Sequence, residues 1–195
     1  MIRFGDNTDW DKFSDEMFSM GEITGDGTDR FDDCRELIKT DTDTKERRAL
    51  DCGCNIGKWY NIVRNYGFKY TGVDSCNKAI FMAREANPNV DFLCSPLWDL
   101  NFSEDFDLVF TNSVLQHNIL VDQEKIIEKI YKALKPGGIF RMEEGTEPIT
   151  TDTQRTKQGW IDMVESHGFK FIKSSKGTYP NTNGIDTRYI FRKEK

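Results

Sequence analysis

The chain has 195 residues, which is long enough for one domain that buries its own core. Its net charge of −6 disfavours a mainly electrostatic grip on nucleic acid, and no apolar run approaches the ~18 residues that a membrane span needs. The opening MIRFGDNTDW lacks the basic and then apolar pattern of a secretory signal, so we expect a cytoplasmic protein.

Residues 1–46 precede any alternation of strands and helices. Trp10 and Phe13 recur at helical spacing, which predicts a short amphipathic helix. The glycine-rich residues 21–30 predict a loop, and residues 31–39 predict a second helix. This segment either packs on the outside of the domain or caps a ligand site, and the sequence leaves both interpretations open.

Residues 47–195 alternate apolar strands with amphipathic helices, as in a doubly wound α/β domain. Seven strands are predicted, one ending at Asp51 and the others over 68–74, 90–94, 106–112, 138–144, 169–175 and 187–193. Helices are predicted over 56–66, 77–86, 122–134 and 152–167. No helix separates the last two strands, so they should pair antiparallel, while strands one and four should meet at the switch point of the sheet. The expected fold is therefore a mostly parallel seven-stranded sheet with helices on both faces and an antiparallel C-terminal strand.

The stretch ALDCGCNIG, Ala49–Gly57, organises this domain. Gly53 allows a sharp turn after the strand that ends at Asp51, and Gly57 lets the following helix approach closely. The N–H groups of such a turn can bind an electronegative ligand. A nicotinamide-dependent dehydrogenase would need the pattern GxGxxG, but Asn55 stands at its middle position, so the sequence disfavours that class.

Several motifs, in the right order, resemble those of the class I S-adenosylmethionine-dependent methyltransferases. LDCGCNIG resembles the first motif, YTGVD places Asp74 at the end of the second strand, and DLNFSEDFDLVFTNSVLQH resembles the fourth-strand region. ALKPGGIFRMEE resembles the glycine turn into the fifth strand, and GWIDMVESHGFKFIK resembles the last helix and sixth strand. The resemblance covers about residues 47–193. It implies a Rossmann-like methyltransferase fold, S-adenosyl-L-methionine as cofactor and S-adenosyl-L-homocysteine as product.

The resemblance also implies which residues bind the cofactor. They follow the first four strands: Asp51, Gly53, Cys54, Asn55, Gly57, Asp74, Ser75, Pro96, Leu97, Asn112 and Ser113. Asp74 should accept hydrogen bonds from the ribose, although its carboxylate could instead cap the next helix, aided by Ser75. Asp51 should orient the turn and reach the amino-acid end of the ligand through water, with backbone groups of Gly53 and Cys54 facing that end.

The sequence departs from the family pattern at two places. Asn55 replaces the usual middle glycine of the first motif, and asparagine tolerates left-handed backbone angles, so the turn should survive. Ser95 or Pro96 stands where an acidic residue often binds the adenine amine. Adenine recognition should then fall to backbone groups around Leu97 or to another side chain.

Two residues are candidates for catalysis. His117 follows the fourth strand at the expected acceptor position and could act as a general base or orient the substrate. Glu143 and Glu144 end the fifth strand at the same edge, and Glu144 could orient a substrate hydroxyl or amine. The alternative for both candidates is a polar residue at the rim of the site. His167 precedes Gly168 at the end of a helix and is predicted to be structural.

The cysteines and histidines predict neither a disulfide framework nor a metal site. The five cysteines are odd in number and irregularly spaced: Cys34, Cys52, Cys54, Cys76 and Cys94. No CxxC or HExxH pattern accompanies them. Buried thiols in a reducing cytosol are the better interpretation.

These features predict an enzyme that moves a methyl group from S-adenosyl-L-methionine to an oxygen or nitrogen of a small-molecule acceptor. TNSVLQH after the fourth strand lacks the [ND]PPY-like motif of members that methylate exocyclic amines of macromolecules, and the acidic charge makes nucleic acid an unlikely partner. A protein or RNA acceptor, or a non-catalytic binding or scaffold subunit with the same fold, are the alternatives. No membrane partner is expected, and the sequence does not indicate the oligomeric state.

Overall fold

The computed structural model describes residues 9–19, 31–32, 46–147, 149, 151–177 and 185–194. The strands are β1 (Arg47–Cys52), β2 (Phe68–Asp74), β3 (Asp91–Cys94), β4 (Phe106–Asn112), β5 (Leu134–Glu147), β6 (Phe169–Lys176) and β7 (Ile185–Lys193). The α-helices are α1 (Trp10–Ser19), α3 (Tyr60–Asn65), α4 (Asn77–Ala86), α5 (Leu120–Ala133) and α6 (Lys157–Glu165), and two 3₁₀ helices are η2 (Leu97–Asp99) and η3 (Leu115–His117).

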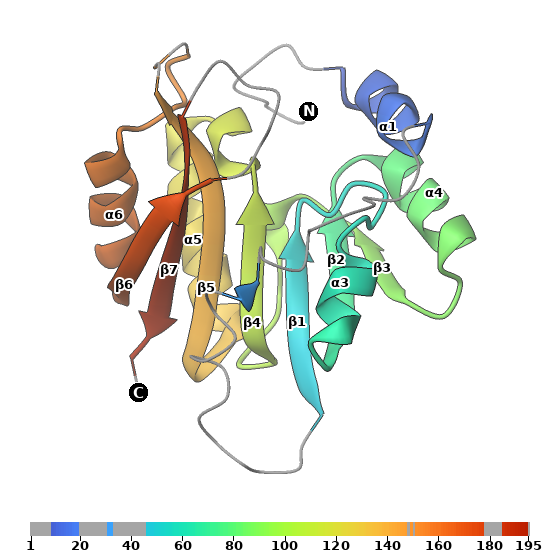
Figure 1. Cartoon of the computed structure of the whole chain (residues 1–195), viewed down its shortest axis with the longest axis horizontal. Coiled ribbons are helices and arrows are strands. Elements are labelled where there is room, and N and C mark those ends of the chain that lie inside the picture. The colour runs from blue at the N-terminus through green and yellow to red at the C-terminus, as the bar shows by residue number, and fades with distance from the viewer. Residues whose placement is uncertain are drawn as a thin grey trace.

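One sheet contains all seven strands, in the order β3-β2-β1-β4-β5-β7-β6 (Figure 1). β1 pairs in parallel with β2 on one side and β4 on the other, and β3 and β5 extend the parallel part outward. β7 runs antiparallel to both of its neighbours, β5 and β6. The expected mixed sheet, its antiparallel C-terminal strand and its switch point between β1 and β4 are therefore confirmed.

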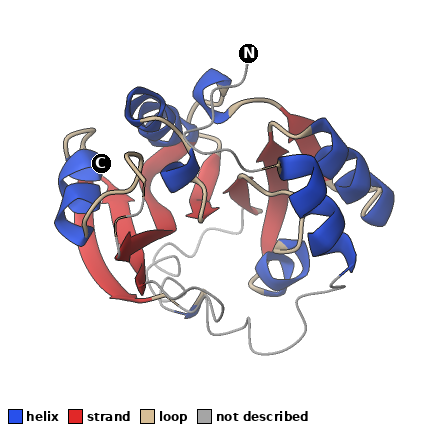
Figure 2. Ribbon diagram, turned by 90° about the horizontal axis from the view of Figure 1, so that it is seen from above, coloured by secondary structure: helices blue, strands red, loops and turns tan. Residues whose placement is uncertain are grey.

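Two hydrophobic layers cover the two faces of the sheet, because neighbouring residues of a strand point to opposite faces. Leu50 and Val109 pack with the buried side chains of α5 and α6. Ala49 and Leu108 pack with those of α3 and α4. Figure 2, seen from above, shows helices on either side of the strands. The strands in the middle of the sheet are thus buried on both faces, which explains their nearly continuous apolar sequences.

The predicted boundaries are accurate where the sequence carries strong local signals. The strands over 68–74 and 106–112 and the helix over 77–86 coincide with β2, β4 and α4. Cys76 is the N-cap of α4, and its sulfur accepts a hydrogen bond from the Ala79 N–H at 3.5 Å.

Three predicted boundaries were wrong, each for a local reason. The helix expected from residue 56 begins at Tyr60, because Asn55 and Gly57 have φ values of 46° and 77° and keep the chain in turns. The helix expected from residue 152 begins after Thr156, whose hydroxyl accepts the Gly159 N–H at 3.1 Å. The KPGG turn, expected to precede the fifth strand, lies within β5, where the pairing with β4 shifts register.

Some predictions fall outside the described residues. They are the glycine-rich loop over 21–30, all but the first two residues of the helix over 31–39, and Cys34. The other four cysteines, Cys52, Cys54, Cys76 and Cys94, are free thiols. None of the described helices is long and apolar enough to cross a membrane.

Candidate active site

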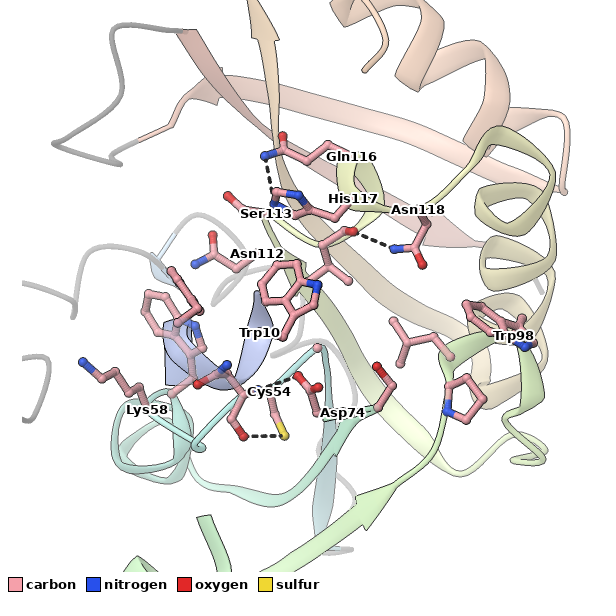
Figure 3. Close-up of a pocket in the computed structure, with 18 of the residues that line it drawn as sticks. Trp10, Cys54, Lys58, Asp74, Trp98, Asn112, Ser113, Gln116, His117 and Asn118 are labelled. Atoms are coloured by element: carbon pink, nitrogen blue, oxygen red, sulfur yellow. Dashed lines mark hydrogen bonds between the residues drawn. The ribbon is translucent and has the colours of Figure 1, made fainter. Parts of the chain in front are cut away.

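A cavity of about 410 Å³ lies beyond the carboxyl ends of the parallel strands β1, β2 and β4, at the switch point where the strand order reverses (Figure 3). Its volume is in the range of small-molecule sites, which is roughly 300–1,000 Å³. Ten residues of the predicted site line it: Gly53, Cys54, Asn55, Asp74, Ser75, Pro96, Leu97, Asn112, Ser113 and His117. Segments that are far apart in the sequence therefore meet at this cavity, as the sequence predicted.

The turn after β1 has the backbone shape that its glycine predicts. Gly53 has a φ of 80°, and a Cβ atom there would lie 2.4 Å from a methyl group of Val114. The N–H groups of Gly53 and Cys54 both donate to the carbonyl oxygen of Val73, at 2.8 and 3.0 Å. The turn uses these two N–H groups to hold itself against β2, so they are not free to bind a ligand. Both residues line the cavity, and the expectation that their backbone groups face the amino-acid end of the ligand stays a prediction.

Asn55 adopts the left-handed backbone conformation for which the motif usually has a glycine. Its φ of 46° is left-handed, and its own Oδ1 accepts the N–H of Ile56 at 2.9 Å. Its backbone N–H donates to Oδ2 of Asp74 at 2.9 Å, and its Nδ2 donates to the hydroxyl of Ser14 at 3.1 Å. The substituted turn therefore survives, and it joins β1, β2 and helix α1.

Asp74 lies at the end of β2, in the wall of the cavity. Its Oδ1 accepts the N–H of Cys76 at 2.8 Å, at the start of α4, and its Oδ2 accepts the N–H of Asn55. Burial raises the pKa of this carboxyl group, and the backbone hydrogen bonds oppose that shift. Holding the start of α4 and facing the cavity are therefore compatible roles, and the sequence had offered them as alternatives.

Three predicted site residues do not line the cavity. Asp51 is buried beneath it, where the Tyr70 hydroxyl donates to Oδ2 at 2.5 Å. Burial raises the pKa of Asp51 to about 8, although the Tyr70 hydrogen bond opposes the shift. Gly57 has a φ of 77°, and a Cβ atom there would lie 2.7 Å from the ring of Phe92, so this glycine serves packing.

Glu144 is the third of these residues, and its position corrects a predicted role. Its side chain is fully buried, and its carboxylate accepts hydrogen bonds from Thr111 and from the chain segment that follows β4. Direct contact with a substrate hydroxyl or amine does not fit this position. The neighbouring Glu143 is also buried and pairs with Arg141 at 2.9 Å and with Arg188 at 3.3 Å.

His117 lies at the end of η3 and in the cavity wall. Its ring meets that of Trp10 edge to face, with the ring centroids 5.0 Å apart. Figure 3 shows it beside Ser113 and Gln116, on the side of the cavity away from Asp74. His167, by contrast, lies at the end of α6, where Nδ1 is 2.9 Å from the Met163 carbonyl oxygen, which agrees with its predicted structural position.

Helix α1 forms part of the cavity through Trp10 and Phe13. Besides the hydrogen bond to Asn55, it is held by an ion pair between Asp15 and Lys78 at 2.5 Å and by a hydrogen bond from the Cys76 thiol to Asp11 at 3.3 Å. The sequence predicted the helix and its apolar stripe. It carried no signal of where the helix packs.

Several lining residues were missed by sequence reasoning. Apart from Trp10 and Phe13 of α1, they are Lys58, Trp59, Trp98, Val114, Gln116, Asn118 and Asp186. Lys58 directly follows the first motif and could have been considered on that ground, whereas Asp186 reaches the site only through the pairing of β7 with β5.

Two polar groups in the wall lack a partner among the described residues. Lys58 makes no hydrogen bond or ion pair with them, and burial lowers its pKa. Oδ1 of Asn112 is buried and accepts no hydrogen bond within the same part of the chain. Figure 3 shows both residues on the side of the cavity opposite Trp98. A buried polar atom without a partner is costly, so Oδ1 of Asn112 indicates where a polar ligand group can bind. The partly exposed Lys58 adds a cation in the same wall.

Within the described ranges, no group of three or more His, Cys, Asp or Glu side chains could hold a metal ion.

Comparison with known proteins agrees with this geometry. A family described as a methyltransferase domain matches residues 50–142. The phosphoethanolamine N-methyltransferase of Plasmodium falciparum is 28% identical over 147 residues, which cover 72% of this chain and 51% of that protein. The trans-aconitate 2-methyltransferase of Rhizobium rhizogenes is 30% identical over 152 residues, which cover 74% of this chain and 59% of that protein. This chain thus matches little more than half the length of these relatives.

The fold has close counterparts among solved structures. The 1,6-didemethyltoxoflavin-N1-methyltransferase of Burkholderia thailandensis, solved with S-adenosylhomocysteine, superimposes with a TM-score of 0.70 over 95% of this chain and 87% of that one, at 16% identity. The sheet order, the cavity at the switch point and the match of residues 50–142 agree with a methyltransferase domain. In the sequence of residues 50–142 and in its fold, this chain is similar to S-adenosylmethionine-dependent methyltransferases.

Proposed function

We propose that this protein transfers a methyl group from S-adenosyl-L-methionine to an oxygen or nitrogen of a small-molecule acceptor, releasing S-adenosyl-L-homocysteine. The observation that carries the proposal is the cavity at the switch point, with the Asp74 carboxylate in its wall beside the turn of the first motif. We also propose the cytoplasm as its location.

The donor fits the cavity in one direction along the sheet. Pro96, Leu97 and Trp98 follow β3 and supply apolar surface for adenine, and Asp74 follows β2 and accepts the ribose hydroxyls. Charge-assisted hydrogen bonds of this kind contribute about 1.5–3 kcal/mol each. No acidic side chain is needed near adenine in this arrangement, which accounts for the missing carboxylate at Ser95 or Pro96.

The amino-acid end of the donor then reaches the far side of the cavity. Lys58 supplies a cation for the α-carboxylate there, and Oδ1 of Asn112 accepts a hydrogen bond from the α-ammonium group. Each thereby gains the partner that it lacks among the described residues. This end of the ligand is held by side chains, because the N–H groups of Gly53 and Cys54 are already used within the turn.

The acceptor lies next to His117 in this proposal. When bound, S-adenosyl-L-methionine supplies a methyl group made electrophilic by its positively charged sulfur. His117 takes the proton from the acceptor hydroxyl or amine, and Trp10 excludes water from above its ring. The protein's main task is to hold the acceptor atom in line with the methyl group.

In this proposal residues 47–195 form the catalytic domain and residues 1–46 form a cap. Helix α1 is the part of the cap that completes the site. Its two aromatic residues face the cavity, while its polar contacts reach Asn55, Cys76 and Lys78. The helix therefore bridges the donor end and the acceptor end of the site. A cap of this kind keeps water away from the reacting atoms.

A small-molecule acceptor is favoured over a protein or an RNA. The relatives named above act, by their names, on phosphoethanolamine and trans-aconitate, which are both small molecules. The net charge of −6 also disfavours a polyanionic partner. A non-catalytic scaffold with this fold is the alternative, and it predicts no cofactor binding. The first experiment distinguishes it from a methyltransferase.

That experiment is a calorimetric titration of the purified protein with S-adenosylmethionine and S-adenosylhomocysteine, beside NADH. Both adenosyl ligands should bind, NADH should not, and Asp74→Ala should abolish binding. Asp91→Ala, which removes an exposed carboxylate from β3, is the matched control and should bind as the wild type does. Ligand at ~100 times its Kd should add ~2.7 kcal/mol of stability. If folded protein that has been freed of co-purified ligand does not bind, the methyltransferase proposal is contradicted and the scaffold alternative is supported.

A further inference from the structure

The carboxylate of Glu144 collects the N–H groups of three consecutive residues. Oε1 accepts those of Val114 and Leu115 at 3.2 and 3.1 Å, and Oε2 accepts that of Gln116 at 3.2 Å. The hydroxyl of Thr111 donates to Oε1 at 3.2 Å. Of these four hydrogen bonds from described residues, three come from the segment that follows β4.

The backbone geometry explains why this segment needs such an acceptor. Ser113 has a φ of 55° and ends the strand, and its N–H donates to the Glu143 carbonyl oxygen at 2.7 Å. The 3₁₀ helix η3 then begins, and the first N–H with a partner inside it is that of His117, which donates to Val114 at 3.2 Å. The three N–H groups before it have no helical acceptor. They are the three that Glu144 receives.

Other groups hold the carbonyl oxygens of the same segment. Nδ2 of Asn118 donates to the Val114 carbonyl at 2.8 Å, and Nε2 of Gln123 donates to that of Leu115 at 3.0 Å. The hydroxyl of Thr153 donates to the carbonyl of Gln116 at 2.6 Å. Glu144 holds the other edge of the segment.

The segment carries two side chains into the cavity. Gln116 and His117 both line it, whereas Glu144 does not. Gln116 is further fixed because its Oε1 accepts the N–H of Gly145, the neighbour of Glu144, at 2.5 Å. The placement of these side chains therefore depends on a carboxylate that no substrate can touch.

We propose that Glu144 is a positioning residue that holds η3 so that His117 and Gln116 face the acceptor. The inference gives Glu144 a part in the reaction only if the proposed methyltransferase function holds, but the geometry that it describes can be tested on the ligand-free protein. An ionised carboxylate suits this position, because both of its oxygens accept hydrogen bonds, whereas an amide turns an NH₂ group toward one of the donors. Burial raises the pKa of Glu144 to about 7, against the opposing effect of its hydrogen bonds, so ionised and neutral forms are both accessible near neutral pH.

The test uses Glu144→Gln with histidine-labelled protein and nuclear magnetic resonance. The chain has two histidines, so His117 and His167 give two ring signals. His167 lies at the end of α6 and serves as the internal reference. In the variant the His117 signal should shift or broaden at fixed pH while the His167 signal stays in place. Thr111→Val is the matched control, because it removes one donor to Glu144 and leaves all three backbone bonds, and it should leave both signals unchanged.

Binding of S-adenosylhomocysteine separates this proposal from the proposed function. Glu144→Gln should change its Kd by less than about threefold, because Asp74 and the adenine wall are not held by Glu144. With an acceptor that the wild-type protein methylates, Glu144→Gln should have a lower kcat and an unchanged KM for S-adenosylmethionine. Wild-type protein that binds no adenosyl ligand contradicts the proposed function alone. Folded Glu144→Gln with an unmoved His117 signal overturns the positioning role alone.

A second measurement tests the proposal on wild-type protein, in case Glu144→Gln does not fold. In wild-type protein, the amide hydrogens of Leu115 and Gln116 should exchange slowly with solvent, because both are hydrogen-bonded to the carboxylate of Glu144. Exchange at the rate of an open loop overturns the proposal without any substitution.

Discussion

Trp10 and His117 meet edge to face with their ring centroids 5.0 Å apart, although 106 positions separate them in the sequence. This contact joins α1, which precedes the sheet, to η3, which follows its fourth strand. It encloses the part of the cavity where the acceptor is proposed to lie. The N-terminal helix is therefore part of the candidate active site.

Replacing Trp10 by alanine should open the cavity. Trp10 lines the cavity, so its removal takes away apolar surface that a bound ligand would bury, and the Kd for S-adenosylhomocysteine should rise by up to about tenfold. Calorimetry measures this change. Phe18→Ala is the control, because Phe18 lies on the same helix, is 56% exposed and does not line the cavity. Equal binding by both variants would contradict a role for Trp10 in the site.

Lys58→Gln should weaken only the interaction with the α-carboxylate of the donor. The Kd for S-adenosylhomocysteine should rise by about tenfold, because a half-buried charge-assisted hydrogen bond is lost. Binding of 5′-methylthioadenosine, which has no amino-acid group, should not change. Lys69→Gln, at an exposed position of β2, should leave both affinities unaltered. A parallel loss for both ligands would mean that Lys58 acts on the fold of the turn.

Local sequence patterns predicted the strands of the sheet and the positions of those site residues that directly follow a strand. FDLVFTN is apolar at its centre and ends in polar residues, so both the strand and the position of Asn112 at its carboxyl end could be read directly. Asp74 and the turn after β1 were placed correctly for the same reason. These residues reach the cavity because parallel strands end at one edge of the sheet.

The surroundings of Glu144 and Asp186 could not be read in that way. Glu144 alternates with Glu143 along β5, and only the path of η3 decides that the carboxylate of Glu144 meets three N–H groups while that of Glu143 meets two arginines. Asp186 reaches the cavity because it pairs with Gly145. Such contacts depend on the register and packing of segments distant in sequence, and no periodicity records them.

Gly57→Ala should destabilise the protein through two separate effects. The φ of 77° disfavours any side chain, and the added Cβ would lie 2.7 Å from the Phe92 ring. Gly137→Ala is the matched control, because Gly137 has a φ of 81° but nothing within 4 Å of the added atom. Left-handed backbone costs roughly 1–2 kcal/mol and overpacking about 1–3 kcal/mol more. At about 2–4 °C per kcal/mol, the melting temperature should fall further for Gly57→Ala than for Gly137→Ala. Equal losses would show that Phe92 moves aside freely.

Stability should decrease as the pH rises toward 8, and Asp51 should be a main cause. Burial raises its pKa from 3.8 to about 8 in the folded protein. Between these values the folded state holds a proton that the unfolded state releases, so folding becomes less favourable as the pH increases. Glu144, with a pKa of about 7, acts in the same direction over a narrower range.

Asp51→Asn tests this dependence, because the amide cannot ionise and its oxygen can still accept the hydrogen bond from Tyr70. Melting temperatures measured from pH 5 to pH 8.5 should fall less steeply for the variant than for the wild type. The gain of the variant over the wild type should be largest at the high end of that range, above the folded pKa of Asp51. Asp107→Asn, at a partly exposed carboxylate paired with Lys135, is the control and should keep the wild-type slope over this range. Parallel curves for Asp51→Asn and the wild type would show that Asp51 ionises in the folded protein as it does in the unfolded chain.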